Sequence, residues 1–196
     1  MKQVEALMQL GFQNKNTSSI IYSCLECRIA LELLDLNKIL LSVKPEEKLK
    51  IIEESKPKNG IDKLGQKKEI LKERYQLFFQ AMNEVLCLNS KYYNFKKSKS
   101  LQFELSTYIH SYHMADEDLN FDSKNIQNAI LLINEVDPFI KSSLIKKNNE
   151  YLCVGMEVES LPVEDKKLLI KWKNDFKMDY DELKKNLKKN VISRKK

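Results

Sequence analysis

The sequence predicts an all-α protein, and three observations support this fold class. The 196 residues include only 4 Gly and 4 Pro, well below the roughly 7% and 5% of average usage, so the chain has few of the turns that a many-stranded protein needs. Apolar residues recur every three or four positions over long stretches, which is the period of a helix face. Hydrophobic residues make up 42% of the chain and charged residues 32%, a composition that allows a packed core and excludes a disordered chain.

The most continuous apolar pattern predicts a long helix over residues 20–43. It is apolar on more than one side, so we expect it to lie centrally. A short amphipathic helix over residues 1–12 is expected to precede it and to be broken by Gly11, and one of the polar residues 17–19 is expected to supply the N-cap of the long helix.

Further helices are expected in the middle of the chain. Their predicted ranges are 45–55, 61–88, 101–112 and 124–147. Pro138 is expected to kink or break the last of these helices, because proline removes a backbone hydrogen bond from a helix interior. With the long helix they predict an up-and-down bundle of four to five helices.

The C-terminal quarter of the chain has a different pattern. Valine and methionine alternate with glycine and glutamate over residues 151–158, which predicts a strand or extended arm that needs a pairing partner, a second protomer being one candidate. Two short helices are expected after it. We therefore divide the chain into an N-terminal short helix or arm (1–16), a helical bundle (17–147) and a small helical C-terminal appendage with the extended segment (148–196).

The cysteines and the apolar runs bear on metal binding and on compartment. Cys24 and Cys27 form a C-x-x-C pair, but zinc would need a second pair or nearby histidines, so we expect structural thiols, no metal and no cofactor. No leader-like segment and no apolar run of ~18 residues occurs, which predicts a cytoplasmic protein without a membrane span. The net charge is +6; the lysine excess is partly the composition of an AT-rich coding source.

The two histidines, His110 and His113, lie three residues apart near the end of a predicted helix. A third metal ligand is lacking nearby, whereas a general acid or base role suits histidine at neutral pH. Ser106 and Tyr112 could orient the imidazole or bind a phosphate. The alternative is a histidine hydrogen-bonded where two helices pack.

Arg28 is one of three arginines in the chain and has Glu32 four residues after it. The two side chains can pair across one helical turn. Because the neighbouring residues are apolar nearly all round, we expect this pair to be partly buried. Such a pair can fix the packing register of a helix or mark a functional site.

A basic segment over residues 91–99 interleaves lysines with aromatic residues. Charge and base stacking together hold single-stranded nucleic acid on such surfaces. The alternative is a solvated loop whose aromatic side chains pack into the core. The candidate nucleic-acid-binding residues are Lys91, Tyr92, Tyr93, Lys96, Lys97 and Lys99.

The long helix with the sequence Tyr22 to Glu32, an aromatic later helix and a late helix ending in His-X-Tyr resemble the HEPN superfamily over roughly residues 17–147. The late helix of that family usually carries an arginine, a polar residue, three further positions and a histidine, often with a tyrosine two residues beyond. His110 and Tyr112 match this motif, Ser106 stands at the polar position, and Leu105 replaces the arginine.

The resemblance implies two alternatives for function, and a third alternative is unrelated to the family. The first is a HEPN-like module that forms a homodimer, assembles with a partner protein of a bacterial antiviral defence or toxin–antitoxin system, and contacts RNA. The second is a metal-independent RNA endonuclease in which His110 acts as acid or base with Ser106 and Tyr112, and Arg28 or a basic residue from elsewhere replaces the motif arginine. The third is a stand-alone helical scaffold.

Overall fold

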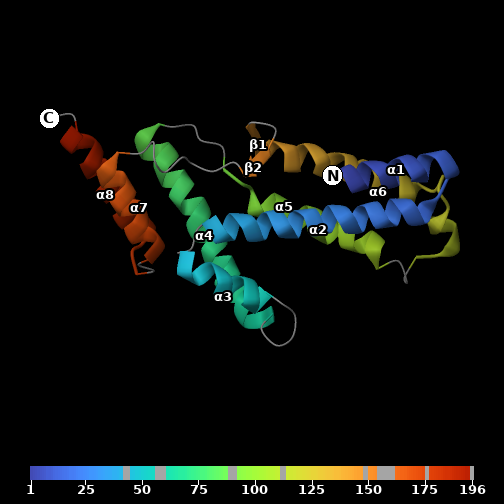
Figure 1. Ribbon diagram of the computed structural model, residues 1–196, viewed down its shortest axis with the longest axis horizontal. Helices are drawn as coiled ribbons and strands as arrows, with labels where there is room; N and C mark the ends of the chain where they lie inside the picture. Colours follow the sequence, from blue (N-terminus) through green and yellow to red (C-terminus); the bar gives the residue numbers. More distant parts are fainter. Residues whose placement is uncertain are drawn as a thin grey trace. The chain divides into compact units, whose positions relative to one another are not determined.

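The computed structural model describes residues 1–41, 45–55, 61–87, 92–110, 114–147, 150–153, 162–174 and 177–194. These residues are predominantly helical, as the sequence predicts, and include one two-stranded hairpin (Figure 1). No helix within these ranges has both the length and the apolar character that crossing a membrane requires. The elements are α1 (Lys2–Asn14), α2 (Thr17–Leu41), α3 (Pro45–Ser55), α4 (Ile61–Leu86), α5 (Phe95–Ile109), the 3₁₀ helix η2 (Asp116–Leu119), α6 (Lys124–Ser142), β1 (Leu144–Lys147), β2 (Glu150–Cys153), α7 (Val163–Asn174) and α8 (Tyr180–Arg194).

The chain forms two compact units, each built from two separate segments. Residues 1–36 and 94–152 make the first unit, and residues 37–93 and 153–196 make the second. Most of α2 therefore belongs to the first unit.

The first unit has a core formed by α1, α2, α5 and α6. α5 and η2 both pack on α6. Apolar side chains from successive turns of each helix meet in this core, which removes their surface from water. The buried residues include Val4, Met8, Ile20, Cys24, Cys27, Leu31, Leu101, Leu105, Ile126, Ala129, Ile133 and Val136.

Gly11 lies inside α1 and does not break it, contrary to the prediction. The helix continues to Asn14 and ends at Lys15, whose backbone adopts the left-handed conformation (φ 48°, ψ 40°). Gly11 instead allows close packing, since a Cβ atom there would lie 2.5 Å from Cδ1 of Ile20. The N-cap of α2 also differs from the prediction: the Ser19 N–H donates to Asn16 Oδ1 at 3.2 Å, one residue before the expected range.

α6 begins as predicted and ends earlier. The Ile126 N–H donates to the Ser123 hydroxyl, so Ser123 caps the helix. Pro138 lies within α6 without ending it, so the predicted break is wrong, and the alternative of a kink stays a prediction. The helix ends at Ser142 rather than at residue 147 because residues 144–147 form β1, which pairs with β2. The predicted extended segment thus finds its partner in its own chain over residues 150–153, and residues 154–158 lie outside the described part.

The second unit contains α3, α4, α7 and α8, with α4 against both α3 and α8, and α7 against α8. Its buried side chains include Tyr75, Phe78, Phe79, Met82, Leu168, Trp172, Leu183 and Leu187. The Arg74 guanidinium stacks on the Trp172 ring at 3.7 Å from its centroid and donates to the carbonyl oxygens of Trp172 and Met178. The Trp172 indole N–H donates in return to the Arg74 carbonyl oxygen at 3.2 Å. These contacts join α4 to α7.

Candidate functional site

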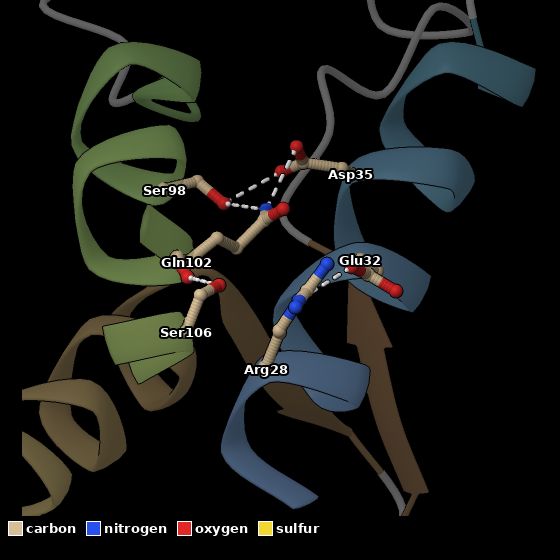
Figure 2. A network of polar contacts seen from close by, with 6 residues as sticks. All are labelled: Arg28, Glu32, Asp35, Ser98, Gln102 and Ser106. Atoms are coloured by element: carbon tan, nitrogen blue, oxygen red, sulfur yellow. Dashed lines mark hydrogen bonds and ion pairs between the residues drawn. The ribbon is translucent and has the colours of Figure 1, made fainter. Parts of the chain in front are cut away.

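A buried polar network joins α2 to α5 in the first unit (Figure 2). The Ser98 hydroxyl donates to Asp35 Oδ1 at 2.8 Å, and the Gln102 amide donates to Asp35 Oδ2 at 3.2 Å and to the Ser98 oxygen at 3.0 Å. Asp35 is only 7% exposed and Ser98 is fully buried. Buried polar groups are tolerated when they are paired in this way, so the network fixes how the two helices face each other.

The two helices run antiparallel along this contact. Near the end of α2, Asp35 lies opposite Gln102 in the middle of α5. Nearer the start of α2, Cys24 lies close to Tyr108 at the end of α5. Burial is the larger cause that raises the pKa of the Tyr108 phenol, and Cys24 is the second cause. Residues between these two levels therefore face each other along the same stretch of the contact between α2 and α5, which we call the seam.

Arg28 and Ser106 occupy this intermediate level. Arg28 Nε donates to Glu32 Oε1 at 3.0 Å, and the two side chains are 33% and 50% exposed. The predicted pair across one turn, and its partial burial, are confirmed. The Ser106 hydroxyl donates to the Gln102 carbonyl oxygen at 2.6 Å, within α5. The Arg28 guanidinium is therefore held by a carboxylate, and the Ser106 proton is directed at the helix backbone (Figure 2).

His110 is the C-terminal cap of α5. Its backbone N–H donates to the Ser106 carbonyl oxygen at 3.1 Å, and the residue is exposed. Leu105, which stands where the HEPN motif has arginine, is 0% exposed and points into the core. Tyr112 and His113 lie outside the described residues.

The predicted basic segment is divided between the two units, and its second half is helical. Asn94 accepts the Lys97 N–H at 2.9 Å and caps α5, so residues 95–100 form the first turns of a helix rather than a loop. Lys96 and Lys99 are exposed. The Lys97 ammonium pairs with Glu135 at 2.9 Å and lies 5.9 Å from the Phe139 ring centroid.

Two of the three aromatic residues of the segment, Tyr92 and Tyr93, lie in the second unit, and the third, Phe95, lies in the first unit and is 4% exposed. Tyr93 is 3% exposed, its N–H donates to the Tyr75 hydroxyl at 3.5 Å, and the Lys38 ammonium lies 5.8 Å from its ring centroid. Its ring is thus packed in the core, where no base could stack on it. Tyr92 is 44% exposed, with its ring 6.2 Å from that of Phe79. Lys91 lies outside the described residues.

Phe103 is an exposed aromatic residue that the sequence analysis did not select. It is 73% exposed, and helical spacing places it on the same side of α5 as Lys96, Lys99 and His110. The sequence contains a signal for the exposure of Phe103: the spacing of Leu101 and Leu105 defines the buried side of the helix, and Phe103 lies opposite to it. This exposed face of α5 combines two positive charges, an aromatic ring and an imidazole.

The thiols of Cys24 and Cys27 lie inside the helical core. Burial raises the pKa of each from 9.0 to about 12, so both are protonated at neutral pH. A protonated thiol is a poor nucleophile and a poor metal ligand. Within the described ranges, no group of three or more His, Cys, Asp or Glu side chains could hold a metal ion.

No family model matches the chain, no curated protein is significantly similar to it in sequence, and no solved structure is significantly similar to it in fold. Two surfaces of the first unit bear on function, the exposed face of α5 and an exposed apolar face of α2.

Proposed function

We propose that this chain is a HEPN-like helical module that pairs with a second copy of itself and assembles with a partner protein of a bacterial antiviral defence or toxin–antitoxin system. The observation that carries the proposal is an apolar face of α2 in contact with solvent. Tyr22, Ile29 and Leu33, which we call the α2 face, are 59%, 40% and 61% exposed. They are spaced seven and four residues apart and share one side of the helix.

The other side of the same helix is already used. Cys24, Cys27 and Leu31 are each 0% exposed and point into the core of the first unit. A helix that is apolar on both sides is typical of one that is covered on both sides. Clustered exposed apolar residues mark interaction surfaces more often than scattered ones do. The α2 face therefore needs a partner surface.

A second copy fits the charges that flank the α2 face. If α2 of one copy packs antiparallel on α2 of a second copy, with a twofold axis near Ile29, the residues on one edge of the α2 face lie beside the same edge on the other copy; we call this edge the flank. Arg28 and Glu32 lie on that flank, so each would approach the opposite charge on the other copy. The pairing is self-complementary, and it places apolar side chains against apolar side chains along the helix.

The proposal describes a module without an assembled RNA-cleaving site of its own. The motif position that would stabilise phosphate charge is Leu105, which is fully buried. Arg28, the nearest arginine along the seam, is held by Glu32 at 3.0 Å. A transition-state anion needs donors aimed at it; Leu105 has none, and the Nε–H of Arg28 is directed at Glu32.

The test is the mass of the protein in solution, measured by light scattering on a size-exclusion column over a range of concentrations. We expect a dimer for the native chain and a monomer for Leu33→Glu. Leu131→Glu is the matched control, because Leu131 is a similarly exposed leucine (66%) on a different helix, α6, and this variant should remain dimeric. A monomeric native chain at all concentrations would contradict the proposal.

A second candidate function is a metal-independent RNA endonuclease centred on His110. The observation that favours it is the exposed face of α5, on which Lys96, Lys99 and Phe103 could hold a strand beside the imidazole. Incubating the purified protein with a mixed RNA pool in EDTA tests it, with His110→Ala as the comparison. Cleavage that is lost in His110→Ala would favour the endonuclease over the non-catalytic module.

A further inference from the structure

Positive charge is concentrated in the second unit. Residues 37–93 and 153–196 contain 24 Lys and Arg against 16 Asp and Glu, whereas residues 1–36 and 94–152 contain 10 against 12. The whole positive excess of the chain thus belongs to one unit. An uneven distribution of this kind is a common electrostatic sign of a surface for polyanions.

Two acidic side chains that contact α8, Asp165 and Glu84, are occupied within the fold, whereas Asp181 and Glu182 in the first turn of α8 are exposed. Asp165 is 1% exposed and accepts hydrogen bonds from Asn190 at 2.8 Å and Arg194 at 2.7 Å. Its charge is therefore balanced inside the unit and does not offset the outer lysines.

Glu84 is occupied in a similar way at the other end of α8. It accepts hydrogen bonds from Gln80 at 3.0 Å and from the Tyr180 hydroxyl at 3.1 Å. The Lys184 ammonium lies 3.5 Å from its other oxygen and 4.4 Å from the Tyr180 ring centroid. Lys184 is thus turned toward α4.

The remaining lysines of α8 point away from the fold. Lys185, Lys188 and Lys189 are exposed and form no ion pair with any residue that the structure describes. Their spacing of three, four and one places them on one side of the helix, opposite the buried Leu183 and Leu187. At 1.5 Å of rise per residue, Lys185 and Lys189 lie about 6 Å apart along the axis.

We propose that these three residues, the lysine face of α8, bind the phosphate backbone of a nucleic acid. Lysine ammonium groups neutralise phosphates without reading sequence, and they release counterions as they do so. The face offers no aromatic ring for stacking, so the contact is to the backbone. This proposal does not depend on HEPN-like character, because it lies in the other unit.

The observations favour a nucleic acid over an anionic membrane. A helix that lies in a membrane interface buries a broad apolar side in the lipid. The apolar side of α8 is used within the second unit, where Leu183 is 0% and Leu187 is 1% exposed. Ile192 is the one large apolar residue exposed on α8 among those described.

Fluorescence anisotropy with a labelled 20-nucleotide RNA of mixed sequence, and separately with a 20-base-pair DNA duplex, tests the proposal. We expect the variant with Lys185→Gln, Lys188→Gln and Lys189→Gln to bind at least about tenfold more weakly at low salt. The slope of log affinity against log salt should fall by about 2 with the single strand, because three phosphate contacts are lost. Comparing the two probes tells whether the backbone is that of a strand or a duplex.

Two controls make the result specific. The matching Lys→Arg triple variant keeps the charge and should keep the affinity, while Lys2→Gln with Lys124→Gln removes exposed charge from the first unit and should change the affinity less than twofold. Equal binding by the native chain and the Gln triple variant would overturn the proposal. So would an equal loss in the first-unit control, or binding to vesicles of phosphatidylserine and phosphatidylcholine without binding to either nucleic acid.

Discussion

The Ser98 hydroxyl and the Asp35 carboxylate are joined by a 2.8 Å hydrogen bond between α5 and α2. The bond lies in the buried part of the seam, where water cannot replace either partner. It sets the register in which Arg28 and Ser106 come to the same level (Figure 2). The seam thus connects the stability of the first unit to the arrangement of its candidate site residues.

Removing the Asp35 carboxylate should destabilise the first unit. Asp35→Ala leaves the donors of Ser98 and Gln102 without their acceptor, and we expect a loss of about 2 kcal/mol in the free energy of unfolding. Urea denaturation followed by circular dichroism measures it. Glu32→Ala is the control, because it removes an acid of the same helix from a half-exposed pair, and it should cost less than about 0.5 kcal/mol. Equal stability of the two variants would contradict the role of the network.

The stacking of Arg74 on Trp172 should be specific to the guanidinium. Arg74→Lys keeps the charge and loses both the planar stack and the forked donor. We expect a loss of about 2 kcal/mol and a red shift of the emission of Trp172, the only tryptophan in the chain, as the indole gains solvent. Lys171→Gln, at an exposed position of α7, should change neither. An unshifted spectrum in Arg74→Lys would show that the stack does not shield the indole.

Gly11 should be intolerant of a side chain even though it lies in a helix. Gly11→Ala gains about 1 kcal/mol of helix propensity, but the new methyl meets the fully buried Ile20 at 2.5 Å from its Cδ1 atom. We expect a net loss of about 1 kcal/mol, measured by thermal unfolding. Ile20→Val removes that Cδ1 atom, so the double variant should be more stable than the two single losses added together. Strict additivity would contradict direct packing of the two residues.

The buried thiols should make the protein less stable at high pH. In the folded chain the pKa values of Cys24 and Cys27 are raised to about 12, whereas in the unfolded chain the thiols titrate near 9. Between these values the unfolded state binds fewer protons, so stability falls as pH rises from about 9 toward 12. Cys24→Ala with Cys27→Ala should flatten this dependence. Lysine and tyrosine titration is otherwise common to both proteins and cancels in the comparison, Tyr108 excepted, because Cys24 contributes after burial to raising its pKa.

Iodoacetamide gives an independent check on the same thiols. At pH 8 the native protein should be alkylated at the exposed Cys87, with Cys24 and Cys27 left unmodified until urea is added. Peptide mass spectrometry identifies the modified residues. Fast alkylation of Cys24 in the native protein would contradict its burial.

The sequence predicts a helix boundary correctly where the residues that determine the boundary lie next to it in the chain. Ser123 caps α6, and a serine before an apolar period is a local signal for a helix start. The end of α6 was not predictable in this way, since β1 replaces its last turn only when it can pair with β2. The sequence predicts that Gly11 breaks α1, and this is wrong because the close approach of Gly11 to Ile20 is a tertiary contact that no local pattern shows.

The candidate site shows the same division between local and tertiary information. The pair of Arg28 and Glu32 was predicted, because four-residue spacing within a helix decides it. The burial of Tyr93 against Tyr75 and the contact of Asp35 with Ser98 depend on segments far apart in the chain. Spacing alone places Lys185, Lys188 and Lys189 on one side of a helix, but that this side faces solvent depends on the burial of Leu183 and Leu187 in the second unit.

The central claim is that two copies pair through the α2 face, and a cysteine placed on the proposed twofold axis tests it most directly. In a background with Cys87→Ser and Cys153→Ser, Ile29→Cys should form a covalent dimer under mild oxidation, because the two thiols would meet across the axis. Leu131→Cys, at an exposed position of α6, should stay monomeric on a non-reducing gel. Absence of the covalent dimer in Ile29→Cys, or its formation to the same extent in Leu131→Cys, would contradict the claim.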